Sequence, residues 1–236
     1  MLRTLLHVAR RLPWVALPPA CRDCGTLLEP LAAATLGFPY LCNRCFDALP
    51  WRPTPAPEED LGALDHIWAP WHYAPPVQPW IWQYKYQRRD GWARCLAGLA
   101  AQALAAGMPL TQYTHLVPVP LHRRRFHWRG FNQALLLAHH WRREVAALRL
   151  PAPPMAPELL RRTRHTRPQM ELGAEDREGN VAGAFAVNAR HVGDVPGARV
   201  LLVDDVMTTG ATLQECAAVL KQGGAETVDA LVMARA

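Results

Sequence analysis

From residue 64 onward, the chain alternates short apolar runs with longer stretches in which apolar residues recur every three or four positions. The short runs are typical of strands and the longer stretches of amphipathic helices. The pattern predicts strands over 66–73, 115–119, 199–203 and 227–233, and helices over 79–87, 92–106, 131–147 and 211–222. This alternation predicts an α/β domain with a mainly parallel sheet and flanking helices on both faces.

Two segments fall outside the alternating pattern. Residues 151–157 are dense in proline, which predicts a loop. Residues 160–176 are rich in arginine and poor in apolar residues, which predicts a mobile excursion from the domain. Long charged loops in compact α/β domains are often functional, so this excursion is a candidate part of a site.

The segment 50–60, PWRPTPAPEED, predicts a linker. Its prolines cannot donate hydrogen bonds to a sheet, and its acidic side chains prefer water. We therefore expect an N-terminal helix and a cysteine module in residues 1–50, a linker over 51–63, and the main domain over 64–236. The helix is expected because apolar residues between positions 2 and 12 recur at helical spacing.

The composition indicates a folded protein, because 50% of the residues are hydrophobic and disordered chains have low hydrophobicity. Arg10 and Arg11 interrupt the apolar residues at the N-terminus, whereas a signal peptide needs an unbroken apolar stretch of roughly 7–15 residues. The sequence also lacks the ~18 consecutive uncharged apolar residues that would span a bilayer. We expect a soluble cytoplasmic protein with no membrane span.

The net charge of +6 is carried almost wholly by arginine, since Lys85 and Lys221 are the only lysines in the sequence. Arginine binds phosphate oxygens in a bidentate fork, which favours a nucleic acid or another phosphate compound as a partner. A genome whose base composition favours arginine codons would produce the same bias. The total charge leaves both explanations open.

Four of the six cysteines form two C-x2-C pairs, Cys21 with Cys24 and Cys42 with Cys45, separated by residues 25–41. A gap of roughly 15–20 residues between such pairs is a zinc-ribbon spacing. Four thiolates fill a tetrahedral site and leave no open position, which predicts structural zinc. Two alternatives are disulfides, which a reducing cytosol disfavours, and a redox dithiol, which normally has one pair. The remaining cysteines are expected to be ordinary buried residues: Cys95 and Cys216.

The most specific motif starts with the apolar run 200–203, VLLV, followed by Asp204 and Asp205. Ligands of open α/β sheets bind at the carboxyl ends of the strands. A short loop then leads into the predicted helix through Thr208, Thr209, Gly210, Ala211 and Thr212. Its amides and hydroxyls suit a phosphate group, and the two carboxylates suit the hydroxyls of a ribose. The alternative is a strand that ends in solvated aspartates, with a threonine capping the next helix.

This combination of an apolar strand, two acids and a T-G-x-T turn resembles the phosphoribosyl-pyrophosphate motif of the type I phosphoribosyltransferases. The resemblance implies a type I phosphoribosyltransferase fold. It implies that Asp204 and Asp205 are catalytic residues that hold the ribose hydroxyls, and that residues 208–212 bind the 5′-phosphate. It also implies that Mg2+ binds together with phosphoribosyl pyrophosphate (PRPP).

Further stretches narrow the resemblance to the ComF-like branch of these proteins, in which a four-cysteine module comes first. They are VPVPLHRRR (117–125) with RGFNQ (129–133), RTRHT (162–166) with Gln169, and YKY (84–86). The resemblance implies that the loop after the strand 115–119 binds pyrophosphate through Leu121, His122 and Arg123. It implies that the arginine-rich excursion is a hood over the reacting centre that includes Arg164, Thr166 and Gln169.

The implied activity is transfer of a phosphoribosyl group from PRPP to an acceptor that the sequence does not identify. The ComF-like family is linked to DNA uptake in natural competence and to the use of imported DNA, so proteins of the uptake machinery are candidate partners. Two non-catalytic alternatives stay open. One is binding of single-stranded DNA by the arginines near 123–129 and 161–167 with aromatic residues such as Trp128. The other is a sensor that binds PRPP without turnover.

Overall fold

The structure is a computed structural model that describes residues 20–28, 40–53, 61–87, 91–122, 124, 126, 130–164 and 181–236. The chain divides into two compact units, Met1–Leu49 and Pro50–Ala236. The helix expected between residues 2 and 12 lies outside the described residues, as does the linker segment 54–60.

The first unit is organised around the two cysteine pairs. Ala20 and Leu27 form an antiparallel bridge that closes the first pair into a tight turn. Gly25 in this turn has a φ of 74°, a left-handed conformation that favours glycine. The second pair lies at the start of α4 (Asn43–Asp47), where Cys42 is the N-cap residue. Each pair is therefore held by a short, local element.

The second unit contains a sheet built from β1 (Ile67–Trp68), β2 (Trp71–His72), β3 (His115–Pro118), β6 (Arg199–Met207) and β7 (Thr227–Arg235). The order is β1-β7-β6-β3, with β2 also beside β7, and all of these pairings are parallel. The long central strands β6 and β7 pair from Arg199 opposite Thr227 to Met207 opposite Arg235. The prediction of a mainly parallel sheet is confirmed.

Two of the predicted strands differ most from the structure. The strand expected over 66–73 is two short strands, β1 and β2, because Pro70 between them has no N–H to donate to a ladder. The strand expected to end at residue 203 continues to Met207, because β7 offers backbone partners along this whole length. Asp204 and Asp205 therefore lie inside the strand.

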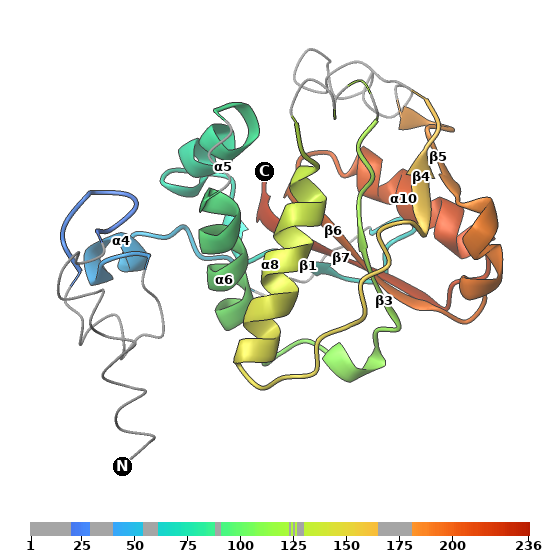
Figure 1. Ribbon diagram of the computed structural model, residues 1–236, viewed down its shortest axis with the longest axis horizontal. Helices are drawn as coiled ribbons and strands as arrows, with labels where there is room; N and C mark the ends of the chain where they lie inside the picture. Colours follow the sequence, from blue (N-terminus) through green and yellow to red (C-terminus); the bar gives the residue numbers. More distant parts are fainter. Residues whose placement is uncertain are drawn as a thin grey trace. The chain divides into compact units, whose positions relative to one another are not determined.

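Helices cover both faces of the sheet, as predicted (Figure 1). On one face lie α6 (Gly91–Leu104) and α8 (Gln133–Ala147), with α5 (Val77–Tyr86) beside α6, and on the other face lies α10 (Ala211–Gln222). Successive side chains of a strand point to opposite faces. Accordingly, Val200 and Leu202 of β6 belong to the core under α10, whereas Leu201 and Val203 are buried on the opposite face.

The arginine-rich segment begins as a strand, which corrects the prediction of an excursion from residue 160. β4 (Leu160–Arg162) pairs antiparallel with β5 (Phe185–Val187) in a separate two-stranded sheet. Leu160 and Phe185 are buried in the core that α10 covers, so two apolar side chains anchor an otherwise charged segment. Residues 165–180 lie outside the described part of the chain.

Both ends of the proposed linker are bound to the second unit. Two backbone hydrogen bonds of 2.9 Å, from Arg52 N to Pro70 O and from His72 N to Pro50 O, join residues 50–52 to residues 70–72 in the antiparallel direction. At the other end, the side-chain amide of Gln214 in α10 accepts a hydrogen bond from Ala63 N at 2.8 Å. The same amide donates to Leu61 O at 2.6 Å.

Aromatic side chains of α5 and α6 pack against each other beside the sheet. The rings of Trp80 and Trp92 stack with centroids 4.9 Å apart, and both side chains are buried. Trp82, two residues after Trp80, is 47% exposed. Cys95 and Cys216 are fully buried, as predicted. Among the described residues, the structure contains no helix of the length and apolar character needed to cross a membrane.

The Trp80→Ala change should lower the free energy of unfolding by about 3–5 kcal/mol, because it removes a fully buried ring together with its stacking contact. The matched change Trp82→Ala on the exposed side of the same helix should cost less than about 1 kcal/mol. Chemical denaturation followed by circular dichroism measures both values. Equal losses in the two variants would contradict the packing of Trp80 in the core.

Candidate functional site

A glycine turn joins the end of β6 to the start of α10. Gly210, the N-cap residue of α10, has a φ of 78°, and a Cβ atom at this position would collide with the side chain of Met207. Thr208 and Thr209 are exposed, and Ala211 N donates to Thr209 Oγ1 at 3.5 Å. The first N–H groups of a helix have no acceptor within the helix and favour an anion. The turn therefore has the geometry and the polarity of an anion site.

The two adjacent acids of β6 have different surroundings. Asp205 is 7% exposed and forms an ion pair with Lys85 of α5, with 2.8 Å between Asp205 Oδ1 and Lys85 Nζ. Asp204 is half-buried, and its Oδ1 accepts a hydrogen bond from Asp205 N at 2.8 Å. Burial, and then the charge of Asp205, raise the pKa of Asp204 to about 7, although Lys85 and Arg162 act in the opposite direction.

The sequence analysis did not predict the ion pair of Lys85 with Asp205. Burial alone would lower the pKa of Lys85, but the charge of Asp205 and the hydrogen bond to it dominate, and the pKa is raised. The sequence signal that could have identified Lys85 is that it is the one charged residue in the aromatic-rich helix predicted over 79–87. The hydroxyl of Tyr73 interacts with the Lys85–Asp205 pair. Burial raises the pKa of Tyr73, the charge of Lys85 lowers it, and the charge of Asp205 raises it.

The predicted pyrophosphate loop follows β3 at the same edge of the sheet as the acids. Val119 N donates to Val203 O at 2.9 Å, so the carboxyl ends of β3 and β6 lie side by side. Leu121 and His122 come next and are half-buried, and Arg123 lies outside the described residues. Asn132 caps α8 and donates through Nδ2 to Val119 O at 3.3 Å, which fixes the far end of this loop.

Of the residues assigned to the hood, the structure describes Arg164, whereas Thr166 and Gln169 lie outside the described residues. Arg164 is exposed and donates through Nη2 to Ala182 O at 2.7 Å, which joins the two ends of the excursion. Arg162, two residues earlier, lies over the ring of Phe185 at 4.9 Å, and its charge lowers the pKa of Asp204. The sequence analysis did not single out Arg162 in this role.

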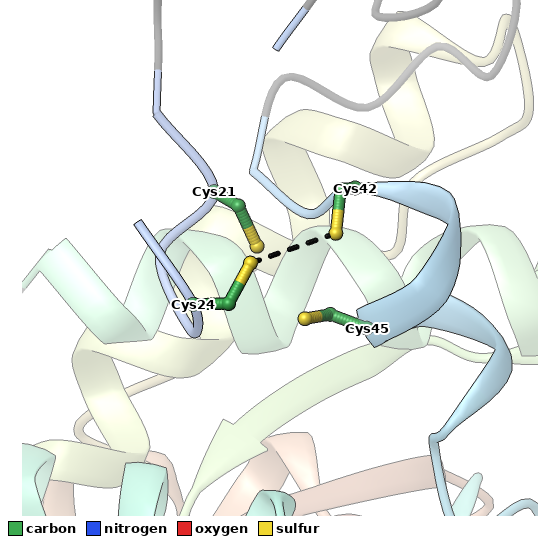
Figure 2. Close-up of side chains that lie close together, drawn as sticks. All are labelled: Cys21, Cys24, Cys42 and Cys45. Atoms are coloured by element: carbon green, nitrogen blue, oxygen red, sulfur yellow. Dashed lines mark hydrogen bonds between the residues drawn. The ribbon is translucent and has the colours of Figure 1, made fainter. Parts of the chain in front are cut away.

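The four cysteines of the two pairs converge on one point (Figure 2). Their sulfur atoms all lie within 4.8 Å of one another, with Cys24 Sγ 3.7 Å from Cys42 Sγ. Hydrogen bonds with the side chain and backbone of Thr26 lower the pKa of Cys24 to about 6, whereas burial raises the pKa of Cys45. Four convergent sulfur donors are compatible with a structural zinc site.

Comparisons with known proteins show which family the chain belongs to. The family model "Phosphoribosyl transferase domain" matches residues 152–236. "Competence protein F" of Haemophilus influenzae is 31% identical over 221 residues, covering 92% of this chain and 85% of that protein. This chain belongs to the ComF family. Another relative is "DNA utilization protein YhgH" of Escherichia coli K12, which is 36% identical over 221 residues, covering 91% of this chain and 83% of its own.

The second unit of this ComF protein has the type I phosphoribosyltransferase fold, with its mainly parallel sheet between flanking helices. A solved structure of the allosteric regulatory enzyme of purine biosynthesis matches 59% of this chain and 25% of its own, at 21% identity and a TM-score of 0.35. The four-cysteine cluster precedes the phosphoribosyltransferase domain, as the resemblance implied.

Asp204 should make the protein less stable as the pH rises from about 4 to about 7. Its pKa is about 7 in the folded chain against an ordinary value of 3.8, so the folded state retains a proton that the unfolded chain has already released. The contribution is at most about 1.4 kcal/mol per pH unit and should disappear in Asp204→Asn. Denaturation across this pH range measures the difference between the two proteins. Parallel profiles would contradict the raised pKa.

Proposed function

We propose that this ComF-family protein binds PRPP with Mg2+ and transfers the phosphoribosyl group to an acceptor. One observation carries the proposal: the acid pair of β6 is followed at once by the glycine turn that opens α10, at the carboxyl edge of a parallel sheet. In this proposal, Asp204 and Asp205 accept hydrogen bonds from the ribose hydroxyls. The amides and hydroxyls of residues 208–212 bind the 5′-phosphate.

The proposed reaction is a displacement at carbon 1 of the ribose. The bond from this carbon to the pyrophosphate oxygen breaks, its electron pair leaves with pyrophosphate, and a nucleophilic atom of the acceptor forms the new bond. Mg2+, held mainly by ligand oxygens and water, would neutralise part of the charge on the leaving group. The chain itself contributes positioning, and its two carboxylates stabilise positive charge on the ribose ring. Leu121, His122 and Arg123 remain the proposed contacts to pyrophosphate.

The ion pair of Lys85 with Asp205 supports this role of the acids. Lys85 Nζ contacts Oδ1 of Asp205, and in this proposal Oδ2 accepts a ribose hydroxyl. The lysine charge also offsets the repulsion between the two carboxylates and an anionic ligand. Removal of this one cation would therefore leave the acid pair less suited to bind a polyphosphate.

We further propose a cytoplasmic role in DNA uptake during natural competence or in the use of imported DNA. The support is the names of the relatives, which describe those proteins as a competence protein and as a DNA utilization protein. A second candidate function, binding of single-stranded DNA, is favoured by exposed aromatic rings. Trp82 is 47% exposed and Phe126 is 46% exposed, and bases of single strands stack on such rings.

Titration calorimetry with PRPP and Mg2+ tests the main proposal. Asp205→Asn should weaken PRPP binding by about 10-fold or more, since a hydrogen bond to a charged group contributes about 1.5–3 kcal/mol. The matched change Asp194→Asn at an exposed acid should leave the affinity unchanged. A folded wild-type protein that does not bind PRPP would contradict the proposal. If the protein binds PRPP but releases no pyrophosphate with any acceptor, the result would favour a sensor that binds PRPP without turnover. If Asp205→Asn still binds oligonucleotides in a salt-dependent way, the result would favour the second candidate function, binding of single-stranded DNA.

We also propose that Cys21, Cys24, Cys42 and Cys45 hold one structural zinc ion. Elemental analysis of the purified protein should give about one zinc per chain. Cys42→Ser should lower this content, because it removes one of four thiolate ligands. The matched change Cys95→Ala, at a cysteine outside the cluster, should leave the zinc content unchanged. A folded first unit that contains no zinc would contradict the proposal.

A further inference from the structure

Helix α5 carries a second row of side chains besides the one that it buries. The side chains that it buries in the core follow helical spacing: Val77, Trp80, Ile81 and Tyr84. Trp82, Lys85 and Tyr86 are three and four positions apart, so they share another face of the helix. Lys85 extends from this row to Asp205, with 2.8 Å between Nζ and Oδ1. The row therefore borders the acid pair.

The two aromatic rings of this row pack against each other. The ring centroids of Trp82 and Tyr86 are 5.8 Å apart, and the ring planes are tilted by 49° or less, at 45°. Trp82 is 47% exposed and Tyr86 is half-buried. We call these two residues the aromatic pair. Nearly half of the indole side chain of the pair thus faces the solvent beside the site.

Tyr73 links the aromatic pair to the carboxyl edge of the sheet. It follows β2, and its N–H donates to Arg235 O at 2.7 Å. Burial is the largest cause of the raised pKa of Tyr73, and the charges of Lys85, Asp205 and Tyr86 also act on it. Because Coulomb interactions weaken with distance, Tyr86 lies near the Lys85–Asp205 ion pair as well as near Trp82.

Contacts to neighbouring helices hold α5 in place. Trp92 Nε1 of α6 donates to Gln83 Oε1 at 3.2 Å, and Tyr84 OH donates to Gln133 O of α8 at 2.8 Å. A ligand that binds to side chains on an anchored helix loses less free energy to ordering of the protein. The aromatic pair is therefore a preorganised surface.

The position of the pair suits the acceptor of the proposed transfer. An acceptor must approach carbon 1 of a ribose whose hydroxyls are bound by Asp204 and Asp205. Along the axis of α5, Trp82 is about 4.5 Å from Lys85, the residue that contacts Asp205. The face of an indole binds a flat aromatic ring by stacking. A ring stacked on Trp82 would thus lie beside a ribose bound at the acid pair.

We propose that Trp82 and Tyr86 form the acceptor subsite, in which a planar aromatic ring of the acceptor stacks on the indole of Trp82. The inference rests on the proposed transfer from PRPP and names residues that determine specificity for the acceptor. The acids and the glycine turn bind PRPP, and the aromatic pair orients the acceptor ring toward carbon 1.

Titration calorimetry with adenine, uracil and orotate tests this subsite. The protein is first saturated with Mg2+ and ribose 5-phosphate, which has no pyrophosphate to lose, so no transfer occurs during the titration. At least one of the three rings should bind the wild-type protein. Trp82→Leu should weaken that binding by about 10-fold or more, whereas Trp82→Phe, which keeps an aromatic face, should stay within about threefold of wild type.

The control is Val192→Ala, at a side chain that is 56% exposed and lies outside α5, and it should leave the affinity unchanged. Circular dichroism checks that each variant folds. Tyr86→Leu provides a second variant, with an expected loss of about threefold or more, should Trp82→Leu not fold. Failure of the wild-type protein to bind any of the three rings, or equal affinity in wild type and Trp82→Leu, would overturn the subsite.

Two further titrations separate this subsite from other roles of Trp82. If Trp82→Leu weakens binding of a deoxythymidine oligonucleotide but not of the three rings, Trp82 belongs to a surface for single-stranded DNA and the subsite is overturned. PRPP affinity should be unchanged in Trp82→Leu, and a loss as large as that for the ring would assign Trp82 to PRPP and overturn the subsite. Wild-type protein that does not bind PRPP would instead overturn the proposed transfer, so the two failures are distinguishable.

Discussion

Two adjacent carboxylates in a strand that is buried on both faces impose the main electrostatic constraint on this structure. Taking a charge out of water costs free energy unless a partner compensates. Because side chains alternate along a strand, Asp205 and Asp204 point to opposite faces, and each face needs its own compensation. Lys85 of α5 supplies it for Asp205 at 2.8 Å. For Asp204 the charges of Lys85 and of Arg162 from β4 offset burial only in part, and the pKa stays raised at about 7.

This constraint makes elements outside the central sheet part of the site. α5 carries the lysine, and its position is fixed by the Trp80–Trp92 stack and by Tyr84, whose hydroxyl donates to Gln133 O at 2.8 Å. The β4–β5 pair carries Arg162, and Gly183 N at its end donates to Glu215 Oε1 of α10 at 2.6 Å. α10 also begins with the glycine turn. The acids, the turn and both cations are thus parts of one connected framework.

Hydrophobic periodicity predicted the four main helices to within two residues at each end, because each buries one apolar face. The same pattern placed the end of β6 too early, because aspartate is unfavourable in strands. Pairing with β7 overrides this preference at Asp204 and Asp205. The pattern missed β4 because the two anchors, Leu160 and Phe185, are separated by a charged segment.

Candidate site residues could be predicted where they lie close together in the sequence, and contacts between distant segments could not. Each cysteine pair and the acid–glycine motif occupy short segments of sequence, so their spacing singled them out as candidates. The Lys85–Asp205 pair joins a helix near the start of the domain to a strand near its end, and only the tertiary fold brings the two together. The roles of Arg123, Thr166 and Gln169 stay predictions from resemblance, because these residues lie outside the described part of the chain.

The pairing of residues 50–52 has a consequence for the edge of the sheet. Arg52 N donates to Pro70 O and His72 N donates to Pro50 O, each at 2.9 Å. These backbone groups on the side of β2 away from β7 therefore have partners within the chain. An exposed strand edge is a template for pairing with a second chain, so the segment that opens the second unit protects this edge against aggregation.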